Sequence, residues 1–562
     1  MAAPALFRCS FERANWEASV KLLRYHLSRR GARLARKAGN DAVHEPRSYA
    51  MPLPEEVAVH WIDVSSHVAC NSAKSDYGRL FGADAMRRLC DWDRVTARSG
   101  ALDGKFLIGV LTTGIYCLPS CPARPPKSEN VRLYRSEADA LAAGLRACKR
   151  CRPDLYYRGE DSDLQLFDGL TARIHNAPQD YLDAGALADA CGVRSTKLGE
   201  LFRVHAHMTP VAFLRRERVR IACGILLERN DRVVEVGLEA GFESESAFHR
   251  QFIAHTRMTP GAWRALRSSS SFLLHLPPAY NANEILAYHA RDPLSPCERV
   301  NGFRIYKALE LVEGAAVLEI SLEREGAWCR VYPEIPRSTQ SMRFVHASAV
   351  RMLGLSCEVE GIESRMARNR ECASLFTMQP GLRLALIPTG FDALCWAIIG
   401  QQINVAFAAS LRREIIELSG MRIGDMRAHP SPERVAGIDI RNLTSRRFSR
   451  SKAEYVTMAA QAIARGDIDL EALRNGSAVA AERSLRNLRG VGRWTAGYQM
   501  LRTGFGDATP IGDVALAAAL KRWQELSERP GHEQVDVMMR RFSPYRALAT
   551  AHLWASLRRE AS

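Results

Sequence analysis

The sequence predicts a multidomain α+β protein, and three observations support this fold class. With 562 residues the chain is too long for one hydrophobic core, so several domains are expected. Two close cysteine pairs indicate a small unit held by a metal, and a repeated Met-Thr-Pro tripeptide indicates two related helical units. A Gly-x-Gly turn near the carboxyl end indicates a further helical domain. We therefore expect a small four-cysteine zinc domain, an all-α tandem helix-turn-helix domain, a small mixed α/β domain and an all-α helix-hairpin-helix domain.

Composition indicates the partner and the compartment. The chain carries 78 Lys and Arg against 62 Asp and Glu, a formal net charge of +16, which favours a polyanionic partner, either nucleic acid or an acidic membrane, and charge alone does not choose between them. No apolar run approaches the roughly 18 to 20 residues that cross a bilayer, so we do not expect a membrane-spanning protein. Most of the 14 cysteines are scattered along the chain, which is typical of reduced thiols in a cytoplasmic protein.

Residues 1–87 are rich in Arg and Ala and lack the pattern of a secretory signal. We expect a basic extension without a fixed fold, or extra residues from an upstream start codon. No chemistry is assigned to it.

The first domain, residues 88–156, is defined by two short-spaced cysteine pairs. Each pair presents two sulfurs to one ion, and four thiolates around a tetrahedral zinc form a typical closed site. A disulfide framework is the alternative. The expected ligands of a single zinc ion are Cys117, Cys121, Cys148 and Cys151.

The residues around these pairs resemble the zinc domain of the Ada adaptive-response proteins. The resemblance rests on the run from Thr112 to Arg124, on Glu129-Asn130-Val131 and on the run from Cys148 to Pro153. It implies that Cys117 accepts a methyl group irreversibly from a methylphosphotriester in DNA, and we expect Arg150 to contact DNA. A metal-bound thiolate is a suitable nucleophile, and its methylation removes a negative charge that repels phosphates. The alternative is that all four cysteines are purely structural.

The second domain, residues 161–267, contains an internal repeat. Phe202 recurs as Phe252, and each Met-Thr-Pro follows a helix-turn-helix pattern with a turn at Gly192 or Gly241. The run from Ala240 to Phe252 resembles AraC-type regulators, which implies two DNA-binding units on one connecting helix, here residues 211–227. A solvated helix face is the alternative for each polar residue. The expected DNA contacts are Ser195, Thr196, Lys197 and Arg203 in the first unit, and Ser244, Ser246, His249 and Arg250 in the second.

The polar run of residues 267–271 predicts a flexible linker, and residues 272–383 predict a mixed domain with strands at 316–322 and 329–332. Complete Ada proteins carry a second active cysteine in Pro-Cys-His-Arg-Val, and this chain has Pro-Cys-Glu-Arg-Val around Cys297. Glu298 replaces the histidine that would take the thiol proton, and its negative charge is expected to raise the pKa of the thiol. We therefore expect no methyl transfer to Cys297.

The last domain, residues 384–562, contains Leu-Arg-Gly-Val-Gly-Arg-Trp at 488–494. A Gly-x-Gly turn between two helices forms a helix-hairpin-helix, in which Gly490 and Gly492 let the backbone approach a DNA phosphate. Asp513 lies nineteen residues beyond Trp494. An acidic residue in this position indicates a DNA glycosylase, whereas a simple helix cap is the alternative.

Residues 272–557 resemble the AlkA family of DNA-3-methyladenine glycosylases. The resemblance rests on the hairpin, on the run from Trp396 to Gln402 and on residues 544–554. The resemblance implies that Asp513 is the catalytic carboxylate and that Trp494, Tyr498 and Trp554 form the aromatic walls of the base pocket. Core aromatics are the alternative for these three. Trp494 occupies the place of the lysine of lyase-competent relatives, so we expect hydrolysis without strand cleavage and without a cofactor. Gln402 stands where AlkA offers a leucine wedge.

Together the resemblances imply a fused sensor, regulator and repair enzyme of the bacterial cytoplasm and nucleoid. It would excise alkylated purines, accept a methyl group on Cys117 and regulate transcription at specific promoters. The expected partners are damaged and promoter double-stranded DNA and RNA polymerase, and the chain is expected to be a monomer. Two alternatives are a transcription factor whose last domain only binds DNA, and a structural nucleoid protein. Asp513 with its aromatic set argues against the first, and the four cysteines argue against the second.

Overall fold

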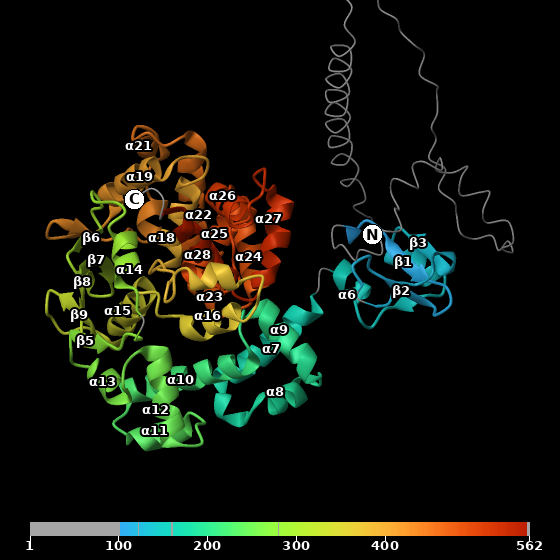
Figure 1. Ribbon diagram of the computed structural model, residues 1–562, viewed down its shortest axis with the longest axis horizontal. Helices are drawn as coiled ribbons and strands as arrows, with labels where there is room; N and C mark the ends of the chain where they lie inside the picture. Colours follow the sequence, from blue (N-terminus) through green and yellow to red (C-terminus); the bar gives the residue numbers. More distant parts are fainter. Residues whose placement is uncertain (1–101, 122, 159–160, 279, 559–562) are drawn as a thin grey trace, which may run out of the picture. The chain divides into compact units, whose positions relative to one another are not determined.

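A computed structural model describes residues 102–121, 123–158, 161–278 and 280–558 (Figure 1). The predicted extension of residues 1–87 lies outside the described residues. Contacts join residues 91–562 into one unit. Along the chain, the structure has a small domain with a sheet and four cysteines, then a helical domain of two units, then a mixed domain, and last a helical domain. The predicted multidomain α+β class is therefore confirmed.

The cysteine-rich domain is a small four-stranded sheet of order β3-β1-β2-β4 with two short helices. Its core contains few large side chains, chiefly Leu107, Tyr116 and Leu145, which is too little to stabilise a fold of this size without a further staple. The elements are β1 (Leu107–Val110), β2 (Ile115–Cys117), β3 (Val131–Tyr134), α5 (Glu137–Ala142), β4 (Arg146–Ala147) and α6 (Pro153–Tyr157).

The next domain is entirely helical and repeats one unit twice, as predicted. Thr209 and Thr259 both cap the helix that a proline then begins, which is the structural meaning of the repeated tripeptide. Gly192 follows the last residue of the helix that precedes the turn of the first unit, and its φ of 64° is in the left-handed region. The elements are α7 (Ser162–Asn176), α8 (Ala184–Cys191), α9 (Ser195–His205), the connecting helix α10 (Pro210–Glu228), α11 (Val233–Glu239), α12 (Glu245–Thr256) and α13 (Pro260–Ala265).

The mixed domain is built on an antiparallel five-stranded sheet of order β5-β9-β8-β7-β6. Two of its strands cover the two strands expected from the sequence. The strands are β5 (Ser271–Leu274), β6 (Glu298–Asn301), β7 (Arg304–Leu311), β8 (Gly314–Glu323) and β9 (Gly326–Tyr332), and the helices are α14 (Ala282–His289), α15 (Thr339–Met352), α16 (Val359–Ala367) and α17 (Ala373–Thr377).

The expected flexible linker at residues 267–271 is wrong. Ser269 donates its hydroxyl to the Ser271 carbonyl at 2.7 Å, and Val331 donates its backbone N–H to the Ser270 carbonyl at 2.9 Å. Phe252 and Trp263 of the second helix-turn-helix unit belong to the same hydrophobic core as the sheet. A polar run therefore ends one domain without separating it from the next, because apolar residues on both sides pack together.

The last domain is helical except for the short hairpin of β10 and β11. Buried residues of α18 form its centre, and a second cluster joins α16 and α17 to α26 and α28. The elements are α18 (Gly390–Ile399), α19 (Val405–Ser419), β10 (Arg422–Ile423), β11 (Met426–Arg427), α20 (Pro432–Ala436), α21 (Ile440–Thr444), α22 (Arg450–Ala464), α23 (Leu470–Asn475), α24 (Ala478–Arg486), α25 (Arg493–Thr503), α26 (Val514–Trp523), α27 (His532–Met539) and α28 (Arg546–Arg558).

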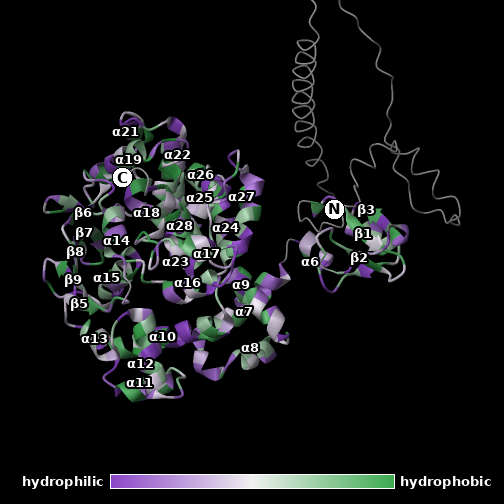
Figure 2. Cartoon of the chain, viewed as in Figure 1, coloured by the Kyte–Doolittle hydropathy of each residue, from purple (hydrophilic) through white to green (hydrophobic). Residues whose placement is uncertain are grey.

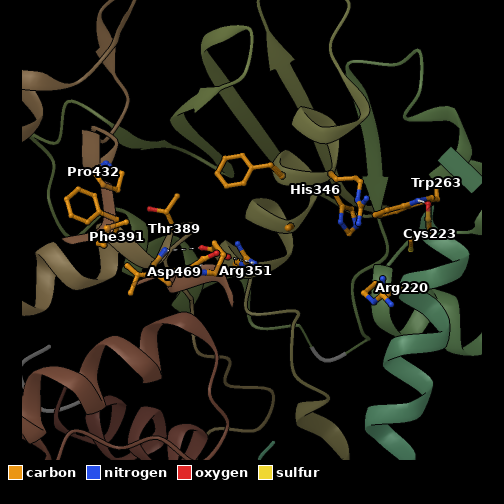
Figure 3. A pocket seen from close by; sticks show the side chains of 16 residues that line it. Arg220, Cys223, Trp263, His346, Arg351, Thr389, Phe391, Pro432 and Asp469 are labelled. Atoms are coloured by element: carbon orange, nitrogen blue, oxygen red, sulfur yellow. Dashed lines mark hydrogen bonds and ion pairs between the residues drawn. The ribbon is translucent and has the colours of Figure 1, made fainter. Parts of the chain in front are cut away.

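A cavity of about 570 Å³ lies where the helix-turn-helix units, the mixed domain and the last domain meet. Figure 3 shows Trp263 and Arg220 at one end and Phe391 and Pro432 at the other, with Arg351 between them. Its lining includes none of the residues that the sequence singled out for chemistry.

Candidate functional site

The four predicted zinc ligands come together. The sulfur atoms of Cys117, Cys121, Cys148 and Cys151 all lie within 4.8 Å of one another. Hydrogen bonds with Cys121 and Cys151, and burial, raise the pKa of the Cys117 thiol, whereas the hydrogen bond from Cys117 lowers that of Cys121 to about 2. Thiolates this close repel one another, so a divalent cation is what would keep all four ionised. The donor set therefore fits zinc.

The cysteine cluster opens on a cavity of about 400 Å³. Cys117 lines it at the end of β2, together with Arg124 and Lys127. Cys151 instead accepts the Leu118 backbone N–H at 3.4 Å. A nucleophilic sulfur beside two cationic side chains can meet a phosphate-bearing ligand, because the cations attract phosphate oxygens. Arg150 is exposed.

The two expected recognition helices are α9 and α12. Ser195, Thr196 and Arg203 are exposed on α9, whereas Lys197 forms ion pairs with Asp163 at 2.6 Å and with Glu200 at 3.8 Å. The charge of Lys197 is therefore engaged within the protein.

On α12 the side chain of Ser244 caps the helix by accepting the Ala247 backbone N–H at 3.3 Å. Ser246 and Arg250 are exposed, and His249 is half-buried. Ser246 and Arg250 are one turn apart, so both can face one ligand.

The Gly-x-Gly turn joins α24 to α25, as the sequence predicts. Gly490 has a φ of 82°, and a Cβ there would lie 2.2 Å from the Tyr455 ring, so the position requires glycine. A Cβ at Gly492 would meet no protein atom within 4 Å. Gly492 precedes the first residue of α25, whose N–H groups have no side-chain cap, so this end can receive an anion.

Asp513 lies at the start of α26 and accepts three hydrogen bonds. Its Oδ1 accepts the Leu516 backbone N–H at 2.8 Å and the indole N–H of Trp554 at 3.1 Å, while its Oδ2 accepts the indole N–H of Trp494 at 3.2 Å. It is thus a helix cap and also the point at which both indoles converge. Both oxygens are therefore held in fixed directions by donors.

The three aromatic residues predicted for the pocket form a row. The ring centroids of Trp494 and Tyr498 are 5.5 Å apart, and those of Tyr498 and Trp554 are 6.0 Å apart. All three are half-buried.

Sequence analysis missed Arg502, a buried residue behind this row. Its guanidinium carbon lies 5.4 Å from the centroid of Tyr498 and 5.3 Å from that of Trp554, and its Nε donates to the Tyr498 hydroxyl at 3.3 Å. Arg502 follows Tyr498 by four residues on α25, and this helical spacing was the signal that could have revealed it.

Three further residues complete the surroundings. The Trp396 indole N–H donates to the Tyr498 hydroxyl at 3.1 Å. Arg291, just after α14 in the mixed domain, lies over the rings of Tyr288 and Trp396, 3.8 Å and 5.3 Å from their centroids. Tyr288 and Arg291 stand some two hundred positions before Tyr498, so no local pattern could have linked them to this site.

Gln402 is exposed in the turn between α18 and α19 and has a φ of 57°. Its neighbour Gln401 ties this turn to the hairpin, because its side-chain amide donates to the Gly490 carbonyl at 2.8 Å and to the Thr495 hydroxyl at 2.9 Å. The predicted wedge position therefore belongs to the same rigid surface as the hairpin.

Cys297 is fully buried. Its sulfur lies 3.5 Å from Lys307 Nζ and 3.4 Å from Arg412 Nη1. Glu298 accepts hydrogen bonds from Lys307 and His289, each at 2.9 Å, so its negative charge is compensated by these donors. Burial is the stronger reason to expect no methyl transfer to this sulfur.

Comparison with known protein families agrees with this geometry. The model described as the metal binding domain of Ada matches residues 90–154, a helix-turn-helix model matches 187–266, the AlkA N-terminal domain matches 271–391 and the HhH-GPD superfamily of base excision DNA repair proteins matches 395–544. The chain combines Ada-type and AlkA-type domains.

Relatives of the whole chain and of each half are known. A probable bifunctional transcriptional activator/DNA repair enzyme AlkA of Mycobacterium tuberculosis is 26% identical over 82% of this chain and 95% of its own length. The bifunctional transcriptional activator/DNA repair enzyme Ada of Escherichia coli is 34% identical over 31% of the chain and 48% of its own length. A DNA-3-methyladenine glycosylase of Bacillus subtilis is 34% identical over 32% of the chain and 60% of its own length.

Among the described residues, no helix is both long and apolar enough to cross a membrane.

Proposed function

We propose that this chain is a DNA alkylation-damage protein that excises alkylated purines, accepts methyl groups on Cys117 and regulates transcription. The observation that carries the proposal is the convergence of two indole N–H groups on the Asp513 carboxylate beside a row of three aromatic rings. The hairpin that precedes this row offers uncapped backbone N–H groups to a DNA phosphate.

In the AlkA-type half, the flipped purine rests on the faces of Trp494, Tyr498 and Trp554. An N3- or N7-alkylated purine is cationic, so aromatic faces and the nearby carboxylate attract it. Its positive charge also makes it a good leaving group, so no strong general acid is required.

Asp513 acts on the sugar. As the bond between C1′ and the base nitrogen breaks, the electron pair leaves with the base and positive charge develops on the deoxyribose. The ionised carboxylate stabilises that charge, and its fixed orientation costs no reorganisation at the moment of reaction. Water then adds to C1′ and loses a proton. With Trp494 in place of a hairpin lysine, the reaction ends at the abasic site without strand cleavage and without a cofactor.

In the Ada-type half, Cys117 is the proposed methyl acceptor. Cys117, Cys121, Cys148 and Cys151 would hold the single zinc ion, and coordination to it would keep the Cys117 sulfur a thiolate at neutral pH. The Cys117 sulfur attacks the methyl carbon of a methylphosphotriester, the bond between that carbon and the phosphate oxygen breaks, and the phosphodiester regains its negative charge. The sulfur becomes an uncharged thioether, so repulsion of neighbouring phosphates falls and DNA binding tightens.

The helix-turn-helix pair supplies promoter recognition through α9 and α12, with RNA polymerase as the partner of the DNA-bound regulator. The alternative is a transcription factor whose AlkA-type half only binds DNA.

A base-release assay on alkylated duplex DNA with the purified chain distinguishes the two functions. We expect free 3-methyladenine to accumulate and the strand to stay intact until alkali is added. Binding without base release is the result expected of the alternative, and a strand cut without alkali would contradict a hydrolytic enzyme.

A further inference from the structure

A cleft of about 460 Å³ lies between α9 of the first helix-turn-helix unit and the AlkA-type half. Figure 1 shows α9 beside α24, and the two helices are in contact. The hydropathy colouring shows hydrophilic residues on α24 and α27 (Figure 2). The basic residues that line the cleft are Arg203, His207, Arg493, Arg540 and Arg546.

Buried hydrogen bonds hold the two walls of this cleft together. His205 Nδ1 lies 2.8 Å from the Ser477 hydroxyl, and both residues are almost fully buried. His207 Nδ1 accepts the Asp507 backbone N–H at 3.1 Å. Burial lowers the pKa of His207 to about 4, so its imidazole is neutral at pH 7, as an acceptor nitrogen must be. The arginines above these contacts are therefore presented by a fixed frame.

The lining of the cleft has four arginines against two carboxylates, those of Asp507 and Glu482, and Glu482 forms an ion pair at 3.6 Å with Arg486, which is outside the lining. Arg493 and Arg540 share a single carboxylate, that of Asp536, at 3.1 Å and 3.4 Å. Arg546 pairs with Asp507 at 2.9 Å. Arg203 is exposed and makes no hydrogen bond or ion pair within the described part of the chain. A phosphate group would supply the missing negative charge.

The cleft is continuous with the hairpin. Arg493 follows Gly492 directly, so a strand whose phosphate meets the hairpin passes the wall of the cleft. On the opposite wall, Arg203 stands on the same exposed face of α9 as Thr196 and Glu200.

We propose that this cleft is a composite binding site for the phosphodiester backbone of duplex DNA, formed by Arg203 of the Ada-type half and by Arg493 and Arg540 of the AlkA-type half. The proposal rests on the proposed function only in that the hairpin meets DNA. It makes the first helix-turn-helix unit part of the surface that holds damaged DNA, independently of promoter sequence.

The test uses the full chain and a duplex of roughly 12 base pairs, little more than one helical turn, which is too short to span both helix-turn-helix units. The duplex carries an abasic-site analogue and no promoter sequence. Affinity is measured at several salt concentrations for the parent, Arg203→Ala, Arg203→Lys and Arg324→Ala. Arg324 is the matched control, since it is an exposed arginine in the turn between β8 and β9, outside the cleft and outside both recognition helices.

We expect Arg203→Ala to weaken binding and to reduce the slope of log K against log salt by about one, since one phosphate contact contributes roughly 0.9. Arg203→Lys should keep most of the slope, and Arg324→Ala should change neither quantity. An unchanged slope for Arg203→Ala, or equal losses for Arg203→Ala and Arg324→Ala, would overturn the composite site. Equal losses would mean that the total charge of the protein, and not a contact in the cleft, sets the affinity.

A second arm distinguishes a DNA strand from a free anion. Inorganic phosphate is added at constant ionic strength. We expect it to displace only a small fraction of the duplex, and the same fraction from the parent as from Arg203→Ala. Displacement that depends on Arg203 would identify free phosphate as the ligand and overturn the assignment. Base release by Arg203→Ala at saturating enzyme reports separately on the glycosylase chemistry, so failure of the cleft and failure of the proposed enzyme give different results.

Discussion

Asp513 has two roles at once, because one carboxylate caps α26 and receives both indole N–H groups. Replacing it with Asn keeps the cap, since Asn and Asp are equally good in that position. The amide has a single oxygen, however, so one indole donor loses its acceptor. The structure thus shows that Asp513→Asn also removes one of the hydrogen bonds that hold the two indole rings, which the sequence pattern did not suggest.

We expect Asp513→Asn to lower the single-turnover rate of alkylpurine release roughly a hundred- to a thousand-fold, since removing one preorganised electrostatic group costs about 2.7 to 4 kcal/mol. Affinity for a duplex with an abasic-site analogue should change little, because a lost negative charge only eases repulsion of phosphates. Asp469→Asn is the matched control, as Asp469 caps α23 and lies outside the aromatic row. Release at the parental rate by Asp513→Asn would assign Asp513 to capping alone.

Cys117 ends β2 and lines an open cavity together with Arg124, and Cys121 and Cys148 line the same cavity, so only a chemical experiment distinguishes the methyl acceptor. We expect Cys117→Ser to abolish methyl uptake from methylphosphotriester DNA and the accompanying gain in DNA affinity. Mass spectrometry of the methylated parent should place one methyl group on Cys117. Cys191→Ser, a thiol outside the cluster, should behave as the parent does. A methyl group on Cys121, Cys148 or Cys151 contradicts the assignment.

At the scale of elements, the hairpin between α24 and α25 contains two glycines with different physical tasks. Gly490 is required by the fold, because its φ is 82° and the Tyr455 ring fills the place of a Cβ. Gly492 has open space around it and negative φ, so any requirement for glycine there comes from a ligand.

We therefore expect Gly490→Ala to lower the free energy of unfolding by about 1 to 2 kcal/mol or more, from the left-handed backbone alone, and to weaken DNA binding with it. Gly492→Ala should leave the urea midpoint unchanged and still weaken binding to an abasic-site duplex. Gly466→Ala separates backbone strain from crowding, because Gly466 has a φ of 79° and no neighbour within 4 Å of a Cβ. Equal behaviour of the two hairpin variants would contradict this division of tasks.

At the scale of the whole molecule, buried histidines make stability depend on pH. Burial lowers the pKa of His207, His346 and His429 to about 4 each, below the ordinary value of 6.5. The unfolded chain then binds more protons than the folded one between these values. The stability that neutral imidazoles contribute is fully present above pH 6.5 and is lost as the pH falls toward 4.

Two of these histidines join the two halves, His207 through the Asp507 backbone N–H and His346 through the Thr256 carbonyl. We expect His207→Asn to reduce the fall in unfolding free energy between pH 6.5 and pH 4, measured by urea unfolding. Asparagine tolerates the φ of 56° at this position and can accept the same N–H, but it does not titrate. His275→Asn, at an exposed histidine, should keep the parental pH profile. An unaltered profile for His207→Asn would mean that the contact between the halves is absent in solution.

The local parts of this protein could be predicted from the sequence. The cysteine pairs, the repeated Met-Thr-Pro and the Gly-x-Gly turn were identified because each is a short motif of neighbouring residues, and Asp513 was identified from its spacing after the turn. Trp494, Tyr498 and Arg502 lie on one face of α25 because of their helical spacing, although only the two aromatic residues were singled out.

What the tertiary structure decided involves residues far apart in the chain. Tyr288 and Arg291 lie beside the aromatic row, the second helix-turn-helix unit shares a core with the five-stranded sheet, and His207 meets Asp507 across 300 positions. Such contacts leave no periodic pattern in the sequence, because each of the two contacting surfaces needs only apolar or hydrogen-bonding side chains. Which two surfaces meet depends on how whole domains pack. The residues proposed to carry the chemistry could therefore be found from short motifs and spacings, whereas the surroundings of the aromatic row and the contacts between the Ada-type and AlkA-type halves were determined by packing.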